Sequence, residues 1–160
     1  MDDMLSLTRD LPEVAFAAGD LVLREGDAAG GIWVLVAGEL SVHKGGVAVN
    51  VINQPGAVVG EISVLLDSRY GATVAATQPT IMRHAQDGRA LLASSPAITT
   101  LVAMGLAERL NFVTTYLVDL THQYGDAPGL AMIPDVLREL TQRQRPPARS
   151  GSARDPDPEY

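Results

Sequence analysis

Residues 56–73 read GAVVGEISVLLDSRYGAT. The stretch holds a single glutamate inside an apolar run, and an arginine and a tyrosine that precede small residues. Gly60 allows backbone amides to approach a ligand, and residues 61–66 can form a helical turn whose N-terminal amides favour an anion. The carboxylate of Glu61 lies among apolar residues and needs hydrogen-bond donors, for which ribose hydroxyls are suitable. Residues of these types are the ones that a binding site for a phosphorylated sugar requires.

Short β-branched segments separated by glycines lie on both sides of this stretch. Regularly spaced short strands with turn signals are typical of a small all-β sandwich or barrel. The predicted strands are residues 21–23, 31–36, 39–43, 47–52, 73–76 and 80–85. Residues 44–46 are predicted to form a hairpin turn, and Asp87 is predicted to cap a helix that begins after the last strand.

A long helix is predicted over residues 96–124, because this segment has no proline beyond its first residue and one interior glycine. Its apolar residues recur in alternating steps of three and four, a spacing typical of contacts between helices. Packing on the protein's own barrel also needs an apolar stripe, but a wider and less regular one. We therefore expect a homodimer, with Ala103, Leu106, Leu110, Val113, Leu117, Leu120 and Tyr124 in the interface.

The chain has 160 residues, enough for one domain with a hydrophobic core and an appendage. Residues 1–12 are predicted to be a lead-in, and residues 13–125 the main domain with its long helix. Residues 126–144 are predicted to hold a short amphipathic helix over residues 130–144, with Leu130, Ile133, Leu137 and Leu140 on one face. Residues 145–160 contain four prolines and no aliphatic side chain larger than alanine, so we expect disorder there.

Charge and composition exclude several classes of function. The formal net charge is −7, which opposes binding to a phosphate backbone, so we expect no nucleic-acid partner. The absence of cysteine excludes disulfides and thiol nucleophiles. The N-terminus is acidic and no apolar run reaches membrane-spanning length, so we expect a cytoplasmic protein without membrane association.

The sequence does not group metal ligands, nucleophiles or paired carboxylates as an enzyme active site requires. His43, His84 and His122 are far apart in the sequence and form no His-x-His pair, so we expect neither a metal nor a cofactor. No serine lies in a strand-turn-helix elbow, and the barrel segment offers only Glu39 and Glu61 as a carboxylate pair. We expect no enzymatic activity, and a metal-dependent barrel enzyme stays as a distant alternative.

Seven short motifs occur in a fixed order along the chain: GD at 19–20, EGD at 25–27, IWVL at 32–35, GELSV at 38–42, PG at 55–56, GEI at 60–62 and ATV at 72–74. In this order and at this spacing they resemble the cyclic-nucleotide-binding domain family. The resemblance implies a mainly β fold with α-helices, a β-roll flanked by short helices and closed by a long one. It also implies a sensor or regulatory module that signals through the long helix, here without the winged helix of related transcription factors and with an unknown effector protein.

The resemblance implies a ligand site in residues 56–73. Gly60 and Glu61 match the start of the family's phosphate-binding cassette, where they hold the ribose 2′-hydroxyl, and Gly71 and Ala72 match small residues whose amides face the cyclic phosphate. Guanine-selective relatives often carry threonine at the place of Gly71, so cAMP is favoured over cGMP. The expected ligand-binding residues are Val59, Gly60, Glu61, Ile62, Ser63, Arg69, Tyr70, Gly71, Ala72, Thr73 and Thr114.

One departure from the family concerns the positively charged residue that contacts the phosphate. Relatives carry an arginine directly before the two small residues, whereas this chain has Tyr70 there and Arg69 one residue earlier. Adjacent side chains of an extended segment point to opposite faces, so either residue could be the one that faces the pocket. Loss of a charge-assisted contact weakens binding roughly ten- to a hundredfold. The alternative function is therefore a ligand-free β-roll scaffold that serves as a dimerising interaction module, with Tyr70 covering the pocket.

Overall fold

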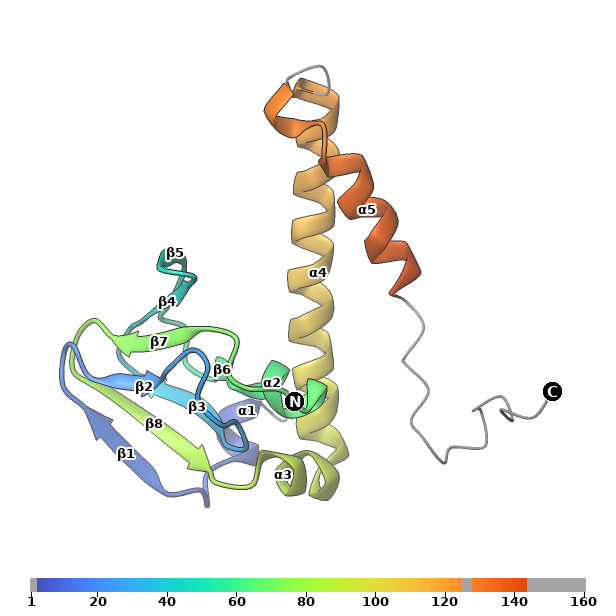
Figure 1. Cartoon of the computed structure of the whole chain (residues 1–160). Coiled ribbons are helices and arrows are strands. Elements are labelled where there is room, and N and C mark those ends of the chain that lie inside the picture. Colours follow the sequence, from blue (N-terminus) through green and yellow to red (C-terminus); the bar gives the residue numbers. More distant parts are fainter. Residues whose placement is uncertain (1–2, 125–127, 144–160) are drawn as a thin grey trace. The chain divides into compact units, whose positions relative to one another are not determined.

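The structure is a computed structural model that describes residues 3–124 and 128–143 (Figure 1). The chain divides into two compact units, Met1–Leu106 and Ala107–Tyr160. The disorder predicted for residues 145–160 concerns residues outside the described ranges. No single helix in those ranges is long and apolar enough to cross a membrane, although one helix pair, bent by 111°, passes that test by length and composition.

The first unit is built on two antiparallel four-stranded sheets that form a β-roll (Figure 1). One sheet has the order β1-β8-β3-β6 and the other the order β2-β7-β4-β5. The strands are β1 Glu13–Phe16, β2 Leu21–Leu23, β3 Ile32–Ala37, β4 Leu40–Lys44, β5 Val47–Ile52, β6 Val58–Val59, β7 Thr73–Ala76 and β8 Thr80–Ala85. The mainly β fold with a β-roll, expected from the sequence, is confirmed.

The predicted strand bounds need small corrections. β2, β5, β7 and β8 have the predicted bounds, whereas β3 and β4 each begin and end one residue later than predicted. The hairpin turn after β4 therefore consists of Gly45 and Gly46 alone, with φ of 57° and 78°. β1 and β6 are missing from the predicted strands, because both are short and exist through pairing with distant strands, β1 with β8 and β6 with β3.

The two sheets enclose the main hydrophobic core. Its largest members, Leu35, Leu40 and Met82, are fully buried and come from β3, β4 and β8. Inward and outward side chains alternate along each strand, so the apolar residues of both sheets meet between them. The half-buried Phe16, Trp33 and Tyr70 pack against this core at its margins.

Four helices complete the first unit: α1 Met4–Leu7, α2 Glu61–Leu66, α3 Gly88–Ser94 and the first part of α4 Pro96–Tyr124. As predicted, the carboxylate of Asp87 caps α3 by accepting a hydrogen bond from the amide of Ala90 at 2.9 Å. In Figure 1, α1, α2 and α3 gather around the first turns of α4. A second core cluster of Met4, Val34, Ile98 and Val102 joins α1, β3 and α4.

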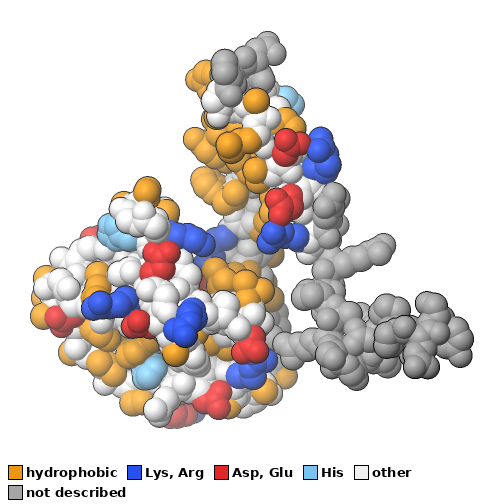
Figure 2. All heavy atoms as spheres, viewed as in Figure 1, with side chains coloured by type: hydrophobic (Ala, Val, Ile, Leu, Met, Phe, Trp, Pro, Cys, Tyr) orange, Lys and Arg blue, Asp and Glu red, His pale blue; other side chains and the backbone are white. Residues whose placement is uncertain are grey.

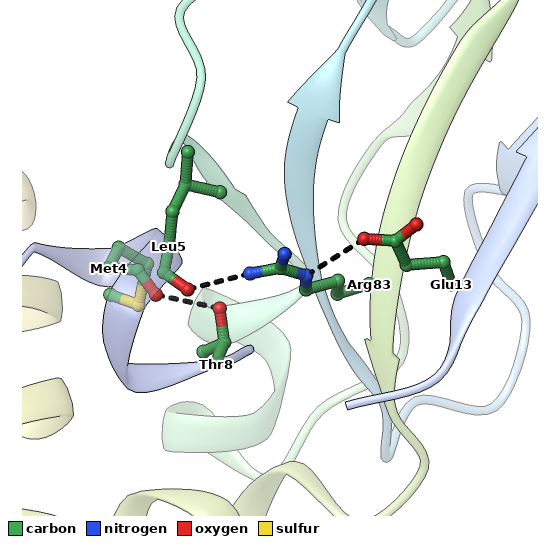
Figure 3. A network of polar contacts seen from close by, with 5 residues as sticks. All are labelled: Met4, Leu5, Thr8, Glu13 and Arg83. Atoms are coloured by element: carbon green, nitrogen blue, oxygen red, sulfur yellow. Dashed lines mark hydrogen bonds and ion pairs between the residues drawn. The ribbon is translucent and has the colours of Figure 1, made fainter. Parts of the chain in front are cut away.

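A polar network attaches α1 to the β-roll (Figure 3). Arg83 of β8 donates a hydrogen bond to the carbonyl oxygen of Leu5 at 2.6 Å and forms an ion pair with Glu13 of β1 at 3.2 Å. The hydroxyl of Thr8, which is 1% exposed, donates to the carbonyl oxygen of Met4 at 2.6 Å. Residues 1–12, the segment predicted as a lead-in, thus contain a helix that is fixed to the domain.

The second unit contains the remainder of α4, a 3-10 helix η1 at Pro128–Leu130, and α5 Ile133–Gln142. Within α5, Ile133 is buried and Leu137 and Leu140 are half-buried, so the predicted apolar face is the covered one. α5 begins three residues later than predicted because η1 holds Leu130, and its predicted end at residue 144 lies outside the described ranges. α4 has the predicted bounds.

Candidate functional site

The site predicted at residues 56–73 is organised around Gly60, which precedes α2. Gly60 has a φ of 92°, in the left-handed region that favours glycine. A Cβ at this position would lie 2.7 Å from the carbonyl oxygen of Gly31, closer than any side chain tolerates. Both the backbone conformation and the close approach of Gly31, the residue before β3, therefore require glycine at this position.

Glu61 begins α2 and is buried, with 2% of its surface exposed. Glu61 is not without an interaction partner, and no buried side-chain nitrogen or oxygen among the described residues lacks a hydrogen-bond partner. Ser63 is also buried, whereas Ile62 is 46% exposed and points away from the interior. Glu61 and Ser63 thus lie on the inner side of α2, which is where a ligand-binding carboxylate would have to be.

Tyr70, and not Arg69, faces inward. The side chain of Tyr70 is half-buried against the main core, and one of its ring carbons lies 3.5 Å from the position that a Cβ on Gly60 would take. Arg69 is exposed, and its guanidinium donates a hydrogen bond to the carbonyl oxygen of Gly26 at 2.9 Å. The alternation of neighbouring side chains therefore places the uncharged aromatic ring, and not the guanidinium, beside Gly60.

The loop after Tyr70 runs beside residues 24–27, which follow β2. The amide of Gly26 donates to the carbonyl of Tyr70 at 2.9 Å, and the amide of Tyr70 donates to the carbonyl of Asp27 at 3.0 Å. The hydroxyl of Thr73 accepts a hydrogen bond from the amide of Glu25 at 3.0 Å. These bonds fix both ends of a short loop in which Gly71 is exposed and Ala72 half-buried.

Lys44, at the end of β4, is missing from the predicted site residues. Its Nζ lies 3.9 Å from the position that a Cβ on Gly71 would take, and no other non-neighbouring atom comes within 4 Å of that position. The sequence does carry a signal for it, because Leu40, Val42 and Lys44 alternate along β4 and so share one face.

Arg89 of α3 holds the C-terminal end of α2. It donates a hydrogen bond to the carbonyl oxygen of Val64 at 3.3 Å and forms an ion pair with Asp67 at 3.4 Å. Asp67 ends α2 with a φ of 54°, a left-handed conformation that aspartate adopts more readily than most residues. The helix that begins at the site is therefore connected to α3, which leads directly into α4.

The predicted residues from Val59 to Thr73 all belong to the first unit, where Ile62 and Arg69 are exposed. Thr114 belongs to the second unit, where its hydroxyl donates to the carbonyl of Leu110 at 2.8 Å, and its role at the site stays a prediction. Residues 3–124 and 128–143 contain no group of three or more His, Cys, Asp or Glu side chains that could hold a metal ion.

Comparison with known proteins identifies the fold and the family. Residues 13–86 match the cyclic nucleotide-binding domain family. The N-terminal domain of a transcriptional regulator from Streptomyces coelicolor A3(2) is similar, with 26% identity, a TM-score of 0.52, and coverage of 71% of this chain and 86% of that one. Catabolite Activator Protein from Thermus thermophilus shares the fold, with 20% identity, a TM-score of 0.57, and coverage of 87% and 81%.

A third similar structure, described as PKAR CBD2 bound to Sp-2Cl-cAMPS, has 18% identity and a TM-score of 0.54, and covers 71% of this chain and 80% of that one. The β-roll and the long helix thus recur in these structures, and the matched segment ends at Gln86, just after β8. Residues 13–86 are therefore the part of the chain that matches the cyclic nucleotide-binding domain family.

Proposed function

We propose that this protein is a regulatory module that binds a cyclic nucleotide and acts through α4, without catalysis of its own. The observation that carries the proposal is the buried Glu61 directly after the left-handed Gly60, in a segment that matches the family. A carboxylate held at this place can accept hydrogen bonds from ribose hydroxyls. The exposed backbone at Gly71 is accessible to the cyclic phosphate.

We favour cAMP over cGMP as the ligand. Position 71 is glycine, without the hydroxyl that guanine-selective relatives often present there. One similar structure holds the cAMP analogue Sp-2Cl-cAMPS, which supports a ligand of this class. The proposed contacts are made by Val59 to Ser63 and by Tyr70 to Thr73, and a contact between Thr114 and the adenine stays a prediction.

Arg89 offers a route from the ligand to α4. Through Arg89, a shift of α2 acts on α3, because one guanidinium contacts Val64 and Asp67 of α2. The carbonyl of Leu92 in α3 accepts a hydrogen bond from the hydroxyl of Thr99 in α4 at 2.7 Å. In this proposal α4 can take two positions. Ligand binding shifts α4 from one position to the other only as far as the affinity for the ligand differs between the two states of the protein.

We further propose that α4 carries the signal through a homodimer or to an effector protein. Several of its apolar side chains are exposed: Leu110 55%, Phe112 71%, Val113 48%, Tyr116 56% and Tyr124 54%. Figure 2 shows hydrophobic side chains gathered on this part of the protein. Leu110, Val113 and Tyr124 belong to the predicted seam, whose other members Leu106, Leu117 and Leu120 are half-buried. We also propose that the protein is located in the cytoplasm.

Calorimetric titration with cAMP and cGMP tests the function. We expect heat of binding for both, with the tighter binding for cAMP, and loss of binding in Glu61→Gln. The Glu39→Gln variant is the control, because it makes the same change at a half-buried carboxylate outside the predicted site, which accepts a hydrogen bond from Thr77 at 2.7 Å. No heat with either nucleotide at millimolar concentration overturns the proposal.

A second candidate function is a ligand-free scaffold that only dimerises. The inward position of Tyr70 and the engagement of Arg69 with Gly26 favour it, because neither residue presents a cation to a phosphate. This candidate predicts that cyclic nucleotides leave the unfolding temperature unchanged, whereas a bound ligand must raise it. Thermal unfolding with and without millimolar cAMP separates the two functions.

A further inference from the structure

We infer that Lys44 is the residue that supplies positive charge to the phosphate of the bound nucleotide. The inference rests on the proposed function and adds a ligand contact from β4, outside the segment where the sequence predicts the site. Three observations carry it: the strand register, the position of the ammonium group, and the orientation of Arg69.

The register of β4 against β7 directs Lys44 toward the site. Leu40 pairs with Ala76 and Val42 pairs with Val74, and all four of these side chains contribute to the main core. Side chains two residues apart share a face, so Lys44 continues the inward row of Leu40 and Val42 at the end of the strand. His43 pairs with Thr73, which brings Lys44 opposite Ala72.

The ammonium group lies over the loop. Its Nζ is 3.9 Å from the position that a Cβ on Gly71 would take, and no other non-neighbouring heavy atom lies within 4 Å of that position. Lys44 is exposed, and its ammonium makes no ion pair or hydrogen bond with any residue that the structure describes. A free ammonium beside an accessible glycine backbone is a suitable arrangement for a phosphate, which lysine binds as a point charge with three donors.

Arg69 and Tyr70, the candidates that the sequence predicts at the loop, are hydrogen-bonded elsewhere. The guanidinium of Arg69 is turned to the carbonyl of Gly26, and the hydroxyl of Tyr70 donates to the carbonyl of Gly31. Glu25 contributes a negative charge, and its carboxylate accepts a hydrogen bond from the amide of Gly45, the residue after Lys44, at 2.9 Å. Lys44 therefore also offsets the repulsion between Glu25 and an incoming anion.

The test compares binding of cAMP and of adenosine by calorimetry in the full chain. Lys44→Met keeps the apolar stem and removes the charge, so we expect affinity for cAMP to fall about ten- to a hundredfold. Adenosine lacks the phosphate, so its affinity should stay unchanged. Lys44→Arg should restore cAMP binding, and Arg69→Met should change it less than threefold because that side chain points outward.

The outcomes separate this inference from the proposed function. Equal loss of cAMP and adenosine binding in Lys44→Met, or no loss of either, overturns the role of Lys44 and leaves the proposed function standing. Absence of heat with cAMP in the unchanged protein overturns both. Thermal unfolding of each variant shows whether it is folded. Glu25→Gln is a second probe: it removes a negative charge and should strengthen cAMP binding if the phosphate lies beside Gly71 and Lys44.

Discussion

The phenol hydroxyl of Tyr70 donates a hydrogen bond to the carbonyl oxygen of Gly31 at 3.3 Å. This bond joins the end of the predicted phosphate loop to the residue before β3. The same carbonyl oxygen is the atom that prevents any side chain at Gly60. Gly31, Gly60 and Tyr70 thus form one close contact at the inner edge of the site, and the side chain at position 70 points into it.

Replacement of Tyr70 by arginine should strengthen binding of the cyclic nucleotide. The new guanidinium would start from the inward position and could pair with the phosphate, so we expect a gain of roughly ten- to a hundredfold in affinity. Calorimetry with cAMP measures it. Tyr70→Phe is the control, since it removes only the bond to Gly31 and should leave affinity within a few-fold. An unchanged affinity in folded Tyr70→Arg would show that the pocket no longer admits nucleotide.

Gly60→Ala should destabilise the protein more than Gly19→Ala does. Both glycines have a φ of 92°, but only at Gly60 would a Cβ meet another atom within 4 Å. The left-handed backbone should lower the free energy of unfolding by about 1–2 kcal/mol in each variant. The contact with Gly31 should add about 1 kcal/mol or more to the loss in Gly60→Ala. Urea denaturation measures both, and equal losses would contradict the close approach.

Stability should fall as the pH drops below the ordinary pKa of histidine. Burial lowers the pKa of His84 below 6.5, and its ring stacks on Trp33 with centroids 3.8 Å apart. Between 6.5 and the lowered pKa the unfolded chain binds a proton that the folded protein does not bind, so the free energy of unfolding rises with pH in this window. His84→Gln should remove that slope, whereas His122→Gln, at an exposed site, should retain it.

The hydrogen bond from Arg89 to Val64 should matter more for signalling than for stability. Arg89 is 54% exposed and Asp67 86%, so Asp67→Asn should change the free energy of unfolding by less than about 0.5 kcal/mol. Arg89→Ala also removes the bond to Val64 and should abolish the protection that cAMP gives to α3 and α4. Hydrogen exchange with and without cAMP is the measurement. If cAMP still protected α3 and α4 fully in Arg89→Ala, residues other than Arg89 would have to connect the ligand site to α4.

Leu110→Asp should dissociate the proposed homodimer without unfolding the protomer. Leu110 is 55% exposed, so its loss leaves no cavity in the core, but a carboxylate in an apolar seam between helices is unfavourable. Asn111→Asp is the matched control, because it adds the same charge at the next exposed position of α4. Sedimentation velocity gives the oligomeric state. A monomeric unchanged protein would remove the homodimer from the proposal and leave an effector protein as the partner of α4.

Much of the fold could be predicted from the sequence because its signals are local. The strand at 47–52, the cap at Asp87 and the helix at 96–124 follow from β-branched runs, a capping residue and an uninterrupted helical pattern. β1 and β6 carry no such signal. Glu13–Phe16 becomes a strand because β8 lies beside it and its residues pair with Arg83, Met82, Ile81 and Thr80.

The family resemblance and the part of the candidate site within one segment could be predicted from the sequence. Gly60 and Glu61 could be found because the glycine conformation and the buried carboxylate concern neighbouring residues. The sequence could not show whether Arg69 or Tyr70 faces inward, since that depends on the carbonyls of Gly26 and Gly31, which lie far away in the sequence. Lys44 enters the site for the same reason: the pairing of β4 with β7 sets its distance to Gly71, and no local pattern encodes a strand register.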